Sequence, residues 1–129
     1  MNDQYPMMIP ASELSDKSGY TLNAIRLKRR KSAWGEFSRK IGKKTVLISV
    51  LAFNKWCARN YPNLKLSTNE IQFALEKRFC QLFGIKSSLL SNFSNSTNIR
   101  YSDLVIKAPD DRRMINVVLF KKHLGLLVH

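Results

Sequence analysis

The sequence is short of acidic residues, of cysteine and of long apolar runs, and each shortage excludes a class of protein. Only nine Asp and Glu stand among its 129 residues, and they are scattered, whereas a metal-dependent nuclease needs several convergent carboxylates. No apolar run approaches the roughly 18–20 residues that a membrane-spanning helix needs. The opening residues show no basic stretch followed by an apolar segment, so we expect no secretory leader and a cytoplasmic protein.

Metal ligands and catalytic motifs are equally scarce. Cys57 and Cys80 fall in segments that we expect to be helices, and without a secretory leader we expect reduced core cysteines rather than a disulfide. His123 and His129 have no pair of cysteines near them, which argues against a zinc site. The isolated glycines form no phosphate-binding loop. We therefore expect no enzyme, no metal and no cofactor.

Positive charge is what the sequence has in excess. The 22 Lys and Arg give a formal net charge of +13, and residues 1–61 hold twelve of them against four acidic residues. The apolar content of 44% is that of a folded chain. A folded protein this basic is expected to bind an acidic polymer, most often nucleic acid. Charge alone leaves ribosome binding, a membrane surface and heparin-like polymers as alternatives.

Two short helices with a tight turn between them are predicted in the first half. Ala11–Ser18 has the composition of a helix, Gly19 interrupts it, and Thr21 can cap a second helix over Leu22–Lys31. Two short helices joined by a turn that contains glycine are typical of a helix-turn-helix. The residues of the second helix expected to face the core, at helical spacing, are Leu22, Ile25 and the stem of Arg29.

A β-hairpin and a third helix are predicted next, and a short strand or arm before Ala11. After Trp34 the periodicity changes from helical to alternating, which predicts two strands with a cationic turn between them. Ser49 can cap a third helix over Val50–Arg59. The alternating residues of the first strand are Phe37, Arg39 and Ile41, the turn is Gly42–Lys44, and the return strand is Thr45–Ile48.

The second half is predicted to contain one helix and a second hairpin. Ser67–Glu70 has the sequence of a capping box, and apolar residues recur at helical spacing from there to Gly84. The Ser- and Asn-rich stretch Leu89–Asn98 is expected to be a loop. The predicted stripe of the helix comprises Ile71, Leu75, Phe79, Leu82 and Phe83. Two strands are expected at Ile99–Lys107 and Met114–Lys121, with a turn at Ala108–Arg112 between them. The tail, His123–His129, is expected to add a strand or a dimer contact.

Together these elements predict an α+β fold with a winged helix-turn-helix DNA-binding domain over residues 1–60. Residues 61–129 are expected to form a helix plus β-hairpin extension, either a second winged-helix-like unit or a module for dimerisation or partner binding. No sequence repeat is visible. Two helix-plus-hairpin units that meet across the third helix are nevertheless an expected architecture, and a homo-oligomer on DNA is one expected assembly.

The cations of the first half fall on the second helix and on the hairpin, where a winged helix-turn-helix contacts DNA. Arg26 and Arg30 are four residues apart and can each present two donors to guanine, and Asn23 can pair with adenine. Lys43 and Lys44 at the turn are expected to contact phosphates. A helix with a charged, solvated face is the alternative interpretation. The expected DNA-binding residues are Thr21, Asn23, Arg26, Leu27, Lys28, Arg29, Arg30, Lys31, Arg39, Lys40, Lys43 and Lys44.

A set of residues between positions 11 and 56 matches a known pattern. They are Ala11-Ser12-Glu13-Leu14-Ser15, Gly19-Tyr20-Thr21, Ala24-Ile25-Arg26, Trp34, Arg39-Lys40-Ile41-Gly42, Ile48-Ser49 and Phe53-Asn54-Lys55-Trp56. In this set the chain resembles the excisionase-like branch of the MerR-type winged-helix superfamily. The resemblance implies a phage or mobile-element protein that recognises double-stranded DNA with its second helix and wing, and bends it. It also implies an integrase or recombinase partner that is directed toward excision, or a promoter under repression.

A second resemblance concerns the later part of the chain. Phe53-Asn54-Lys55-Trp56-Cys57, Leu66-Ser67 through Phe79, and Asn98–Ile106 resemble the lead helix, second helix and wing of the winged-helix module of some phage and plasmid primase-helicases. This resemblance implies a replication accessory protein that binds single-stranded DNA or a primase or polymerase partner. Tyr61, Phe93 and Tyr101 are then the candidates for stacking on bases. An RNA-binding protein is a third alternative, and no membrane partner is expected.

Overall fold

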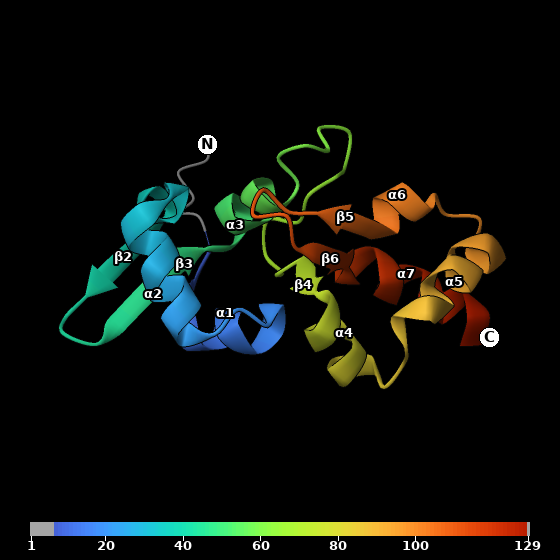
Figure 1. Ribbon diagram of the computed structural model, residues 1–129, viewed down its shortest axis with the longest axis horizontal. Helices are drawn as coiled ribbons and strands as arrows, with labels where there is room; N and C mark the ends of the chain where they lie inside the picture. Colours follow the sequence, from blue (N-terminus) through green and yellow to red (C-terminus); the bar gives the residue numbers. More distant parts are fainter. Residues whose placement is uncertain (1–6, 129) are drawn as a thin grey trace.

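Two small antiparallel sheets and seven α-helices make up residues 7–128, which the computed structural model describes. Each sheet has three strands, and the helices pack around both (Figure 1). The expected α+β class is confirmed at this level. None of the described helices combines the length and the apolar composition that crossing a membrane requires.

The first half of the chain forms the sheet β1-β3-β2 with three α-helices. Its elements are β1 (Met8–Pro10), α1 (Ala11–Ser18), α2 (Leu22–Lys31), the 3₁₀ helix η1 (Ala33–Phe37), β2 (Ser38–Ile41), β3 (Thr45–Ser49) and α3 (Val50–Cys57). Both strand pairings are antiparallel. The predicted helices, strands and turn are confirmed. The predicted cap of the third helix is confirmed too, because Ser49 Oγ accepts a hydrogen bond from Ala52 N–H at 3.2 Å.

Two helices of this half differ from the prediction in detail. Leu22, predicted to face the core, is 52% exposed. Ile25 is the buried residue of α2, and the half-buried Ala24 packs against the same cluster. α3 ends at Cys57 rather than Arg59, where the chain tightens into a turn before the proline that follows.

The first predicted strand of the hairpin is confirmed as β2, but its alternating residues do not form a buried face. Arg39 and Ile41 are exposed, and Phe37 belongs to η1 and is half-buried. The buried residue of the strand is Ser38, whose hydroxyl donates a hydrogen bond to Trp34 O at 2.8 Å. η1 brings the large aromatic side chains inward before the strand begins, so the strand itself has little apolar surface to bury.

The second half forms the sheet β4-β6-β5. Its elements are β4 (Phe73–Leu75), α4 (Glu76–Phe83), the 3₁₀ helix η2 (Ser87–Leu89), α5 (Leu90–Thr97), α6 (Tyr101–Leu104), β5 (Val105–Lys107), β6 (Arg113–Asn116) and α7 (Val117–Val128). Gly84 ends α4 in the left-handed conformation, with φ at 68°, as predicted. The predicted turn over Ala108–Arg112 is confirmed, because Asp111 N–H donates to Ala108 O at 2.8 Å.

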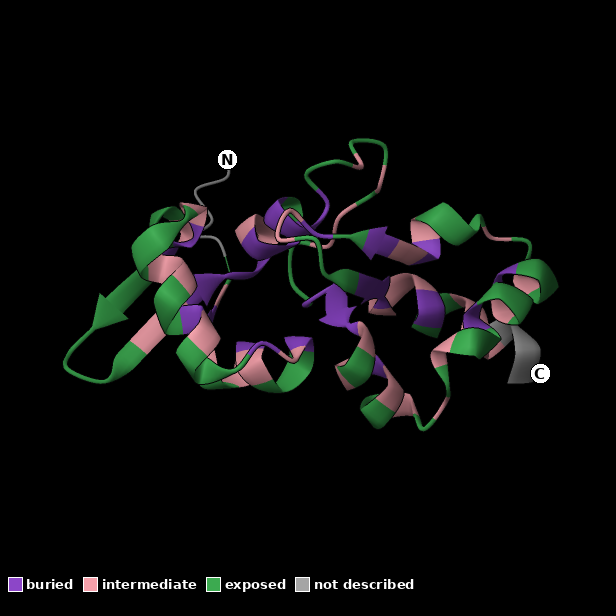
Figure 2. Cartoon of the chain, in the orientation of Figure 1, coloured by how far each residue is buried: buried purple, intermediate pink, exposed green. Residues whose placement is uncertain are grey.

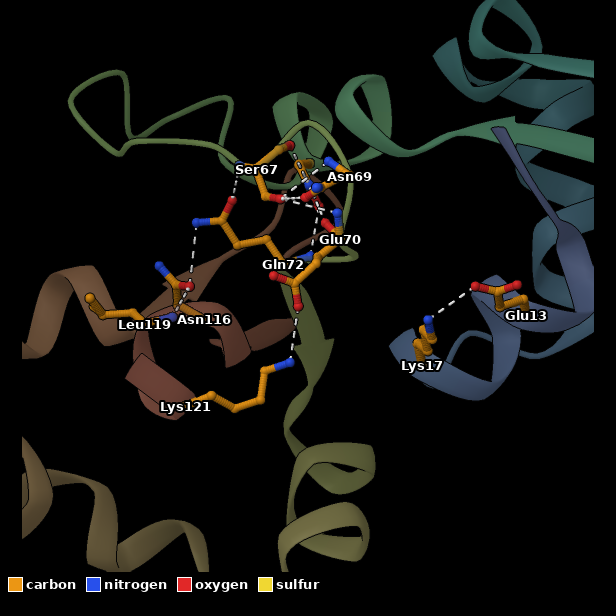
Figure 3. A network of polar contacts seen from close by, with 10 residues as sticks. Glu13, Lys17, Ser67, Asn69, Glu70, Gln72, Asn116, Leu119 and Lys121 are labelled. Atoms are coloured by element: carbon orange, nitrogen blue, oxygen red, sulfur yellow. Dashed lines mark hydrogen bonds and ion pairs between the residues drawn. The ribbon is translucent and has the colours of Figure 1, made fainter. Parts of the chain in front are cut away.

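The helix predicted directly after Ser67 is wrong. Ser67 Oγ does accept a hydrogen bond from Glu70 N–H at 3.0 Å, but the chain then runs extended into β4 (Figure 3). Asn54 on α3 is the reason: its amide donates to the carbonyls of Ser67 and Glu70, and its Oδ1 accepts from Gln72 N–H. With these groups bound to α3, Phe73–Leu75 pairs with β6 and helix begins only afterwards. Of the predicted stripe, Ile71, Leu75 and Phe79 are buried, Phe83 is half-buried and Leu82 is exposed.

Leu89–Asn98, predicted as a loop, contains α5. Leu90 and Ser94 are buried, and the ring of Phe93 lies 4.6 Å from that of Phe120, centroid to centroid. These three residues of α5 recur at helical spacing. Their burial therefore stabilises a helix from Ser and Asn residues that have low helix propensity.

The strands predicted at Ile99–Lys107 and Met114–Lys121 are shorter than expected. The first segment contains α6 before β5 begins, and the second ends as a strand at Asn116. Asn116 Oδ1 accepts a hydrogen bond from Leu119 N–H at 3.0 Å, so it caps α7 and converts the segment to helix. α7 continues through the tail to Val128, so the strand alternative for His123–His129 is wrong, while the alternative of a dimer contact stays a prediction. His129 lies outside the described range.

The two halves share one large core, and the second half has a smaller one of its own. The larger cluster of buried side chains joins residues of both sheets, such as Ile48 of β3 and Met114 of β6, and the smaller cluster includes Phe79. Buried segments accordingly lie in both sheets (Figure 2). Cys57 is buried in the larger cluster and, like Cys80, is a free thiol, as predicted. Burial raises the pKa of the Cys57 thiol.

Replacement of Asn54 by alanine tests the junction between α3 and β4. The change removes three hydrogen bonds and leaves the buried backbone N–H of Gln72 without its acceptor. We expect the free energy of unfolding to fall by about 2–4 kcal/mol, measured by urea denaturation. Asn63→Ala, at an exposed loop position, is the matched control, with an expected change below about 0.5 kcal/mol. Equal effects of the two variants would contradict the role of Asn54.

Candidate nucleic-acid interface

The turn between α1 and α2 is fixed by Gly19 and Thr21. Gly19 has φ at 90°, and a Cβ there would lie 2.6 Å from Cβ of Arg78 on α4, so only glycine permits this approach. Thr21 Oγ1 accepts a hydrogen bond from Ala24 N–H at 3.0 Å and caps α2, as predicted. The guanidinium of Arg78 donates to the backbone carbonyl and the carboxylate of Asp16, at 2.6 and 2.8 Å. The end of α1 and the turn that leads to α2 are therefore held against α4 in the second half of the chain.

α2 turns one face toward the core and the opposite face toward solvent. On the inner face, Ile25 is 2% exposed. The exposed residues of the helix and its cap are Thr21, Leu22, Asn23, Arg26, Leu27, Arg30 and Lys31. Six of these seven are predicted DNA-binding residues, so the structure brings them together on one helix surface.

The far end of the β2–β3 hairpin is exposed (Figure 2), and the hairpin carries four of the predicted cations, Arg39, Lys40, Lys43 and Lys44. Gly42 allows the turn because its φ is 69°. Lys43 and Lys44 occupy that turn, and Lys40 is exposed on the strand before it. Arg39 is exposed but partly committed to its own strand, because its Nη1 donates to the carbonyl oxygen of Ser38 at 2.8 Å.

A groove of about 570 Å³ lies between α2 and this hairpin. Arg26 and Arg29 from α2, Lys40 from β2, and Lys43 and Lys44 from the turn all line it, and no acidic residue does. A concave surface lined by charges of one sign concentrates the electrostatic potential. The groove therefore suits a polyanion that follows the helix and touches the hairpin.

Arg29 is held in place at the edge of the groove. Its Nε donates a hydrogen bond to Ser38 Oγ at 2.7 Å, and that hydroxyl is itself fixed to Trp34 O. The arginine side chain is half-buried. A cation held in position loses less conformational entropy when it binds a phosphate than a freely rotating one.

Lys28 differs from the other predicted residues because its side chain points toward the second half of the chain. Its Nζ lies 3.0 Å from Asp110 Oδ2, in the β5–β6 turn, and only 21% of the lysine side chain is exposed. The ammonium also lies 5.2–5.7 Å from the ring centroids of Tyr20, Trp34 and Trp56, within the range of cation–π attraction. These contacts favour a role in holding α2, rather than contact with DNA.

Asp110 accepts a second hydrogen bond in the same cluster, from the hydroxyl of Tyr20 at 2.8 Å. Burial alone raises the pKa of Asp110, but the hydrogen bonds from Lys28 and Tyr20 and the charge of Lys28 outweigh burial and lower it. Burial, together with the hydrogen bond to Asp110, raises the pKa of Tyr20 well above its ordinary value. Asp110 is therefore an ionised carboxylate, and Tyr20 is a neutral donor.

The sequence pattern predicts Asp110 in a turn and gives Tyr20 no role of its own. The turn is confirmed, but the contact across 90 residues has no local pattern that predicts it. The one available signal is an acidic residue among the cations of a basic hairpin. Such a residue is a candidate for an intramolecular ion pair.

Replacement of Asp110 by asparagine tests this cluster. Because its folded pKa is lowered, Asp110 contributes stability that is present above its ordinary pKa of 3.8 and is lost as pH falls through the folded value. We expect Asp110→Asn to lower the free energy of unfolding at pH 7 by about 1–3 kcal/mol. The variant should then lose less stability than the wild type as the pH falls below about 4.

The neighbouring Asp111→Asn is the control for this experiment, measured by urea denaturation across pH. Asp111 has the same charge, but 86% of its side chain is exposed, and its positive φ of 69° suits asparagine. Identical pH profiles for the two variants would contradict the assignment.

Metal ligation and known relatives give no further guide to this surface. Among residues 7–128, no group of three His, Cys, Asp or Glu side chains is placed to hold a metal ion. No family model, curated protein or solved structure matches the chain.

Proposed function

We propose that this chain is a sequence-specific protein for double-stranded DNA, with α2 as the recognition helix of a winged helix-turn-helix and the β2–β3 hairpin as its wing. The observation that supports this proposal is the groove between these two elements, lined by five cations and no acidic residue. The order of strand, two helices and hairpin in the first half is also the order that such a module requires.

The exposed face of α2 suits the major groove of B-DNA. A helix with its side chains is about 10–12 Å across, and the major groove is about 12 Å wide. Arg26 and Arg30, both exposed, can each offer two donors to O6 and N7 of guanine, and Asn23 can pair with adenine. These three side chains supply sequence discrimination in the proposal.

The hairpin and the edges of α2 supply affinity through phosphates. Lys40, Lys43 and Lys44 lie across the groove from α2, and Arg29 lines its edge. Each phosphate that is neutralised releases condensed counterions. For each such phosphate, the affinity therefore falls by about 0.9 log unit for every ten-fold rise in salt concentration. Lys31, exposed at the end of α2, is placed for the same kind of contact.

Within this class, we propose a recombination directionality factor, or excisionase, or else a small transcriptional regulator of a phage or mobile element. The resemblance of residues 11–56 to excisionase-like proteins supports this choice. The test is footprinting on the DNA around the gene. Protection beside an integrase attachment site supports excision, protection over a promoter supports repression, and protection at neither contradicts both roles.

The alternative, a replication accessory protein for single-stranded DNA, has less support from the aromatic side chains. Phe93 packs on Phe120, and the half-buried Tyr61 accepts a hydrogen bond at its hydroxyl from Lys107 N–H at 3.0 Å. Tyr101, at 41% exposed, remains open for stacking on a base. One exposed ring gives a weaker platform for bases than the three residues expected from the sequence.

Alanine at Arg26 and at Arg30 tests the recognition helix. A duplex site is first selected from a random library with the wild-type protein, and affinities for that site and for a scrambled duplex are then compared. We expect each variant to lose about ten-fold in affinity for the selected site, and little for the scrambled duplex. Lys65→Ala, an exposed cation of the second half, is the control. Variants that bind both duplexes as the control does would refute the proposal.

The wing is tested in the same assay by its salt dependence. Removal of Lys43 and Lys44 together is expected to weaken binding to both duplexes alike, because phosphates carry no sequence information. The slope of log affinity against log salt should become shallower by about 1 for each lysine–phosphate pair that the substitutions remove. If the slope is the same as that of the wild type, Lys43 and Lys44 do not contact phosphates, and the hairpin is not part of the interface.

A further inference from the structure

The two halves of the chain repeat one order of elements. Each begins with a three-residue strand and an eight-residue helix that ends at a left-handed glycine, Gly19 in the first half and Gly84 in the second. In the first half α2, the short helix η1, two strands and α3 follow. In the second half η2 and α5, the short helix α6, two strands and α7 follow, and the sheets have the equivalent orders β1-β3-β2 and β4-β6-β5. In each half the residue that ends the third strand, Ser49 or Asn116, caps the next helix.

By this repeat, α5 occupies in the second half the position of α2 in the first. Ile25 of α2 and Leu90 of α5 are as far apart along the chain as Gly19 and Gly84, and both are buried. The residues that follow keep this correspondence in their exposure. The exposed pairs at the same separation are Arg26 and Ser91, Leu27 and Asn92, Arg30 and Asn95, and Lys31 and Ser96.

The outward face of α5 consists of amides and hydroxyls. Asn92 and Asn95 are one turn apart, so they lie on the same face of the helix. Their side chains bond to no other group within residues 7–128, whereas the inward Ser94 and Thr97 bond to carbonyls of their own helix. Asparagine is a poorer helix former than alanine, so these two residues do not serve the stability of the helix. A free amide presents the donor and acceptor pair that matches N7 and N6 of adenine.

The charge around α5 is compatible with DNA. Lys86 precedes the helix and Arg100 follows it, and no acidic residue lies between them. The turn of the second hairpin faces the first half instead, because Asp110 is bound there to Lys28 and Tyr20. The exposed face of α5 carries no such intramolecular contact among the described residues. α2 and α5 lie toward opposite ends of the long axis (Figure 1), so they would contact separate blocks of base pairs.

We propose that α5 is a second recognition helix, which contacts A·T base pairs in the major groove of double-stranded DNA through Asn92 and Asn95. The inference rests on the proposed function of the first half. It extends that function to a DNA target with two blocks of base pairs, one contacted by α2 and the other by α5. Because Asn92 and Asn95 are uncharged, their contacts contribute sequence discrimination and leave the salt dependence of binding unchanged.

The double variant Asn92→Ala/Asn95→Ala tests this proposal. Alanine has the higher helix propensity, so the variant should unfold at no lower temperature than the wild type, and a change in DNA binding then reports on the interface. Sequences are selected from a random duplex library with both proteins. We expect the wild type to select an adenine-containing block of base pairs that the variant no longer selects. The ratio of the affinity for DNA with this block to the affinity for DNA without it should fall about ten-fold for each asparagine replaced. The slope of affinity against salt should be the same for both.

The controls separate this inference from the proposed function. Asn63→Ala removes an exposed amide outside α5 and should select the wild-type sequences, while Arg26→Ala should lose the other block. If the wild type selects no sequence at all, the proposed function itself fails. If the wild type selects a block that depends on Arg26, and the double variant selects the same DNA as the wild type, only the second recognition helix is refuted.

Discussion

Asp110 reaches from the β5–β6 turn into the first half of the chain and accepts hydrogen bonds from Lys28 and Tyr20. Each of these groups offsets the cost of burying the others. A lysine surrounded by the rings of Tyr20, Trp34 and Trp56 needs a counter-charge, and a half-buried carboxylate needs donors. Since Lys28 lies on α2, this cluster also sets where the exposed face of α2 points. The proposed DNA interface therefore depends on a residue from the far half of the sequence.

The two halves use the same order of elements for different purposes. In the first half the hairpin is free, its turn carries Lys43 and Lys44, and it forms one wall of the cationic groove. In the second half the β5–β6 turn is bound to the first half. The helix α5 of the second half exposes amides where α2 exposes cations. One hairpin is thus available for phosphates, and the other holds the two halves together.

Local signals predicted the first half well because its elements are stabilised by neighbours in sequence. Thr21 and Ser49 cap the helices they precede, and Gly42 makes the turn of a short hairpin. The same signals failed at Ser67, where the cap geometry is present but Asn54 binds the backbone that a helix would need. They failed again at α5, whose Ser and Asn residues are typical of a loop. The packing of Phe93 on Phe120 makes that segment a helix.

The sequence by itself determined the α+β class, the caps and turns, and the concentration of positive charge on α2 and the hairpin, because each follows from residue type and short-range spacing. Tertiary structure decided which of those cations face outward. Arg26 and Arg30 are exposed, whereas Lys28 is bound by Asp110. Helical spacing gives the angle of a side chain around its helix. It does not say what another part of the chain places there, and that contact separates a cation that holds the fold from one that is free to bind DNA.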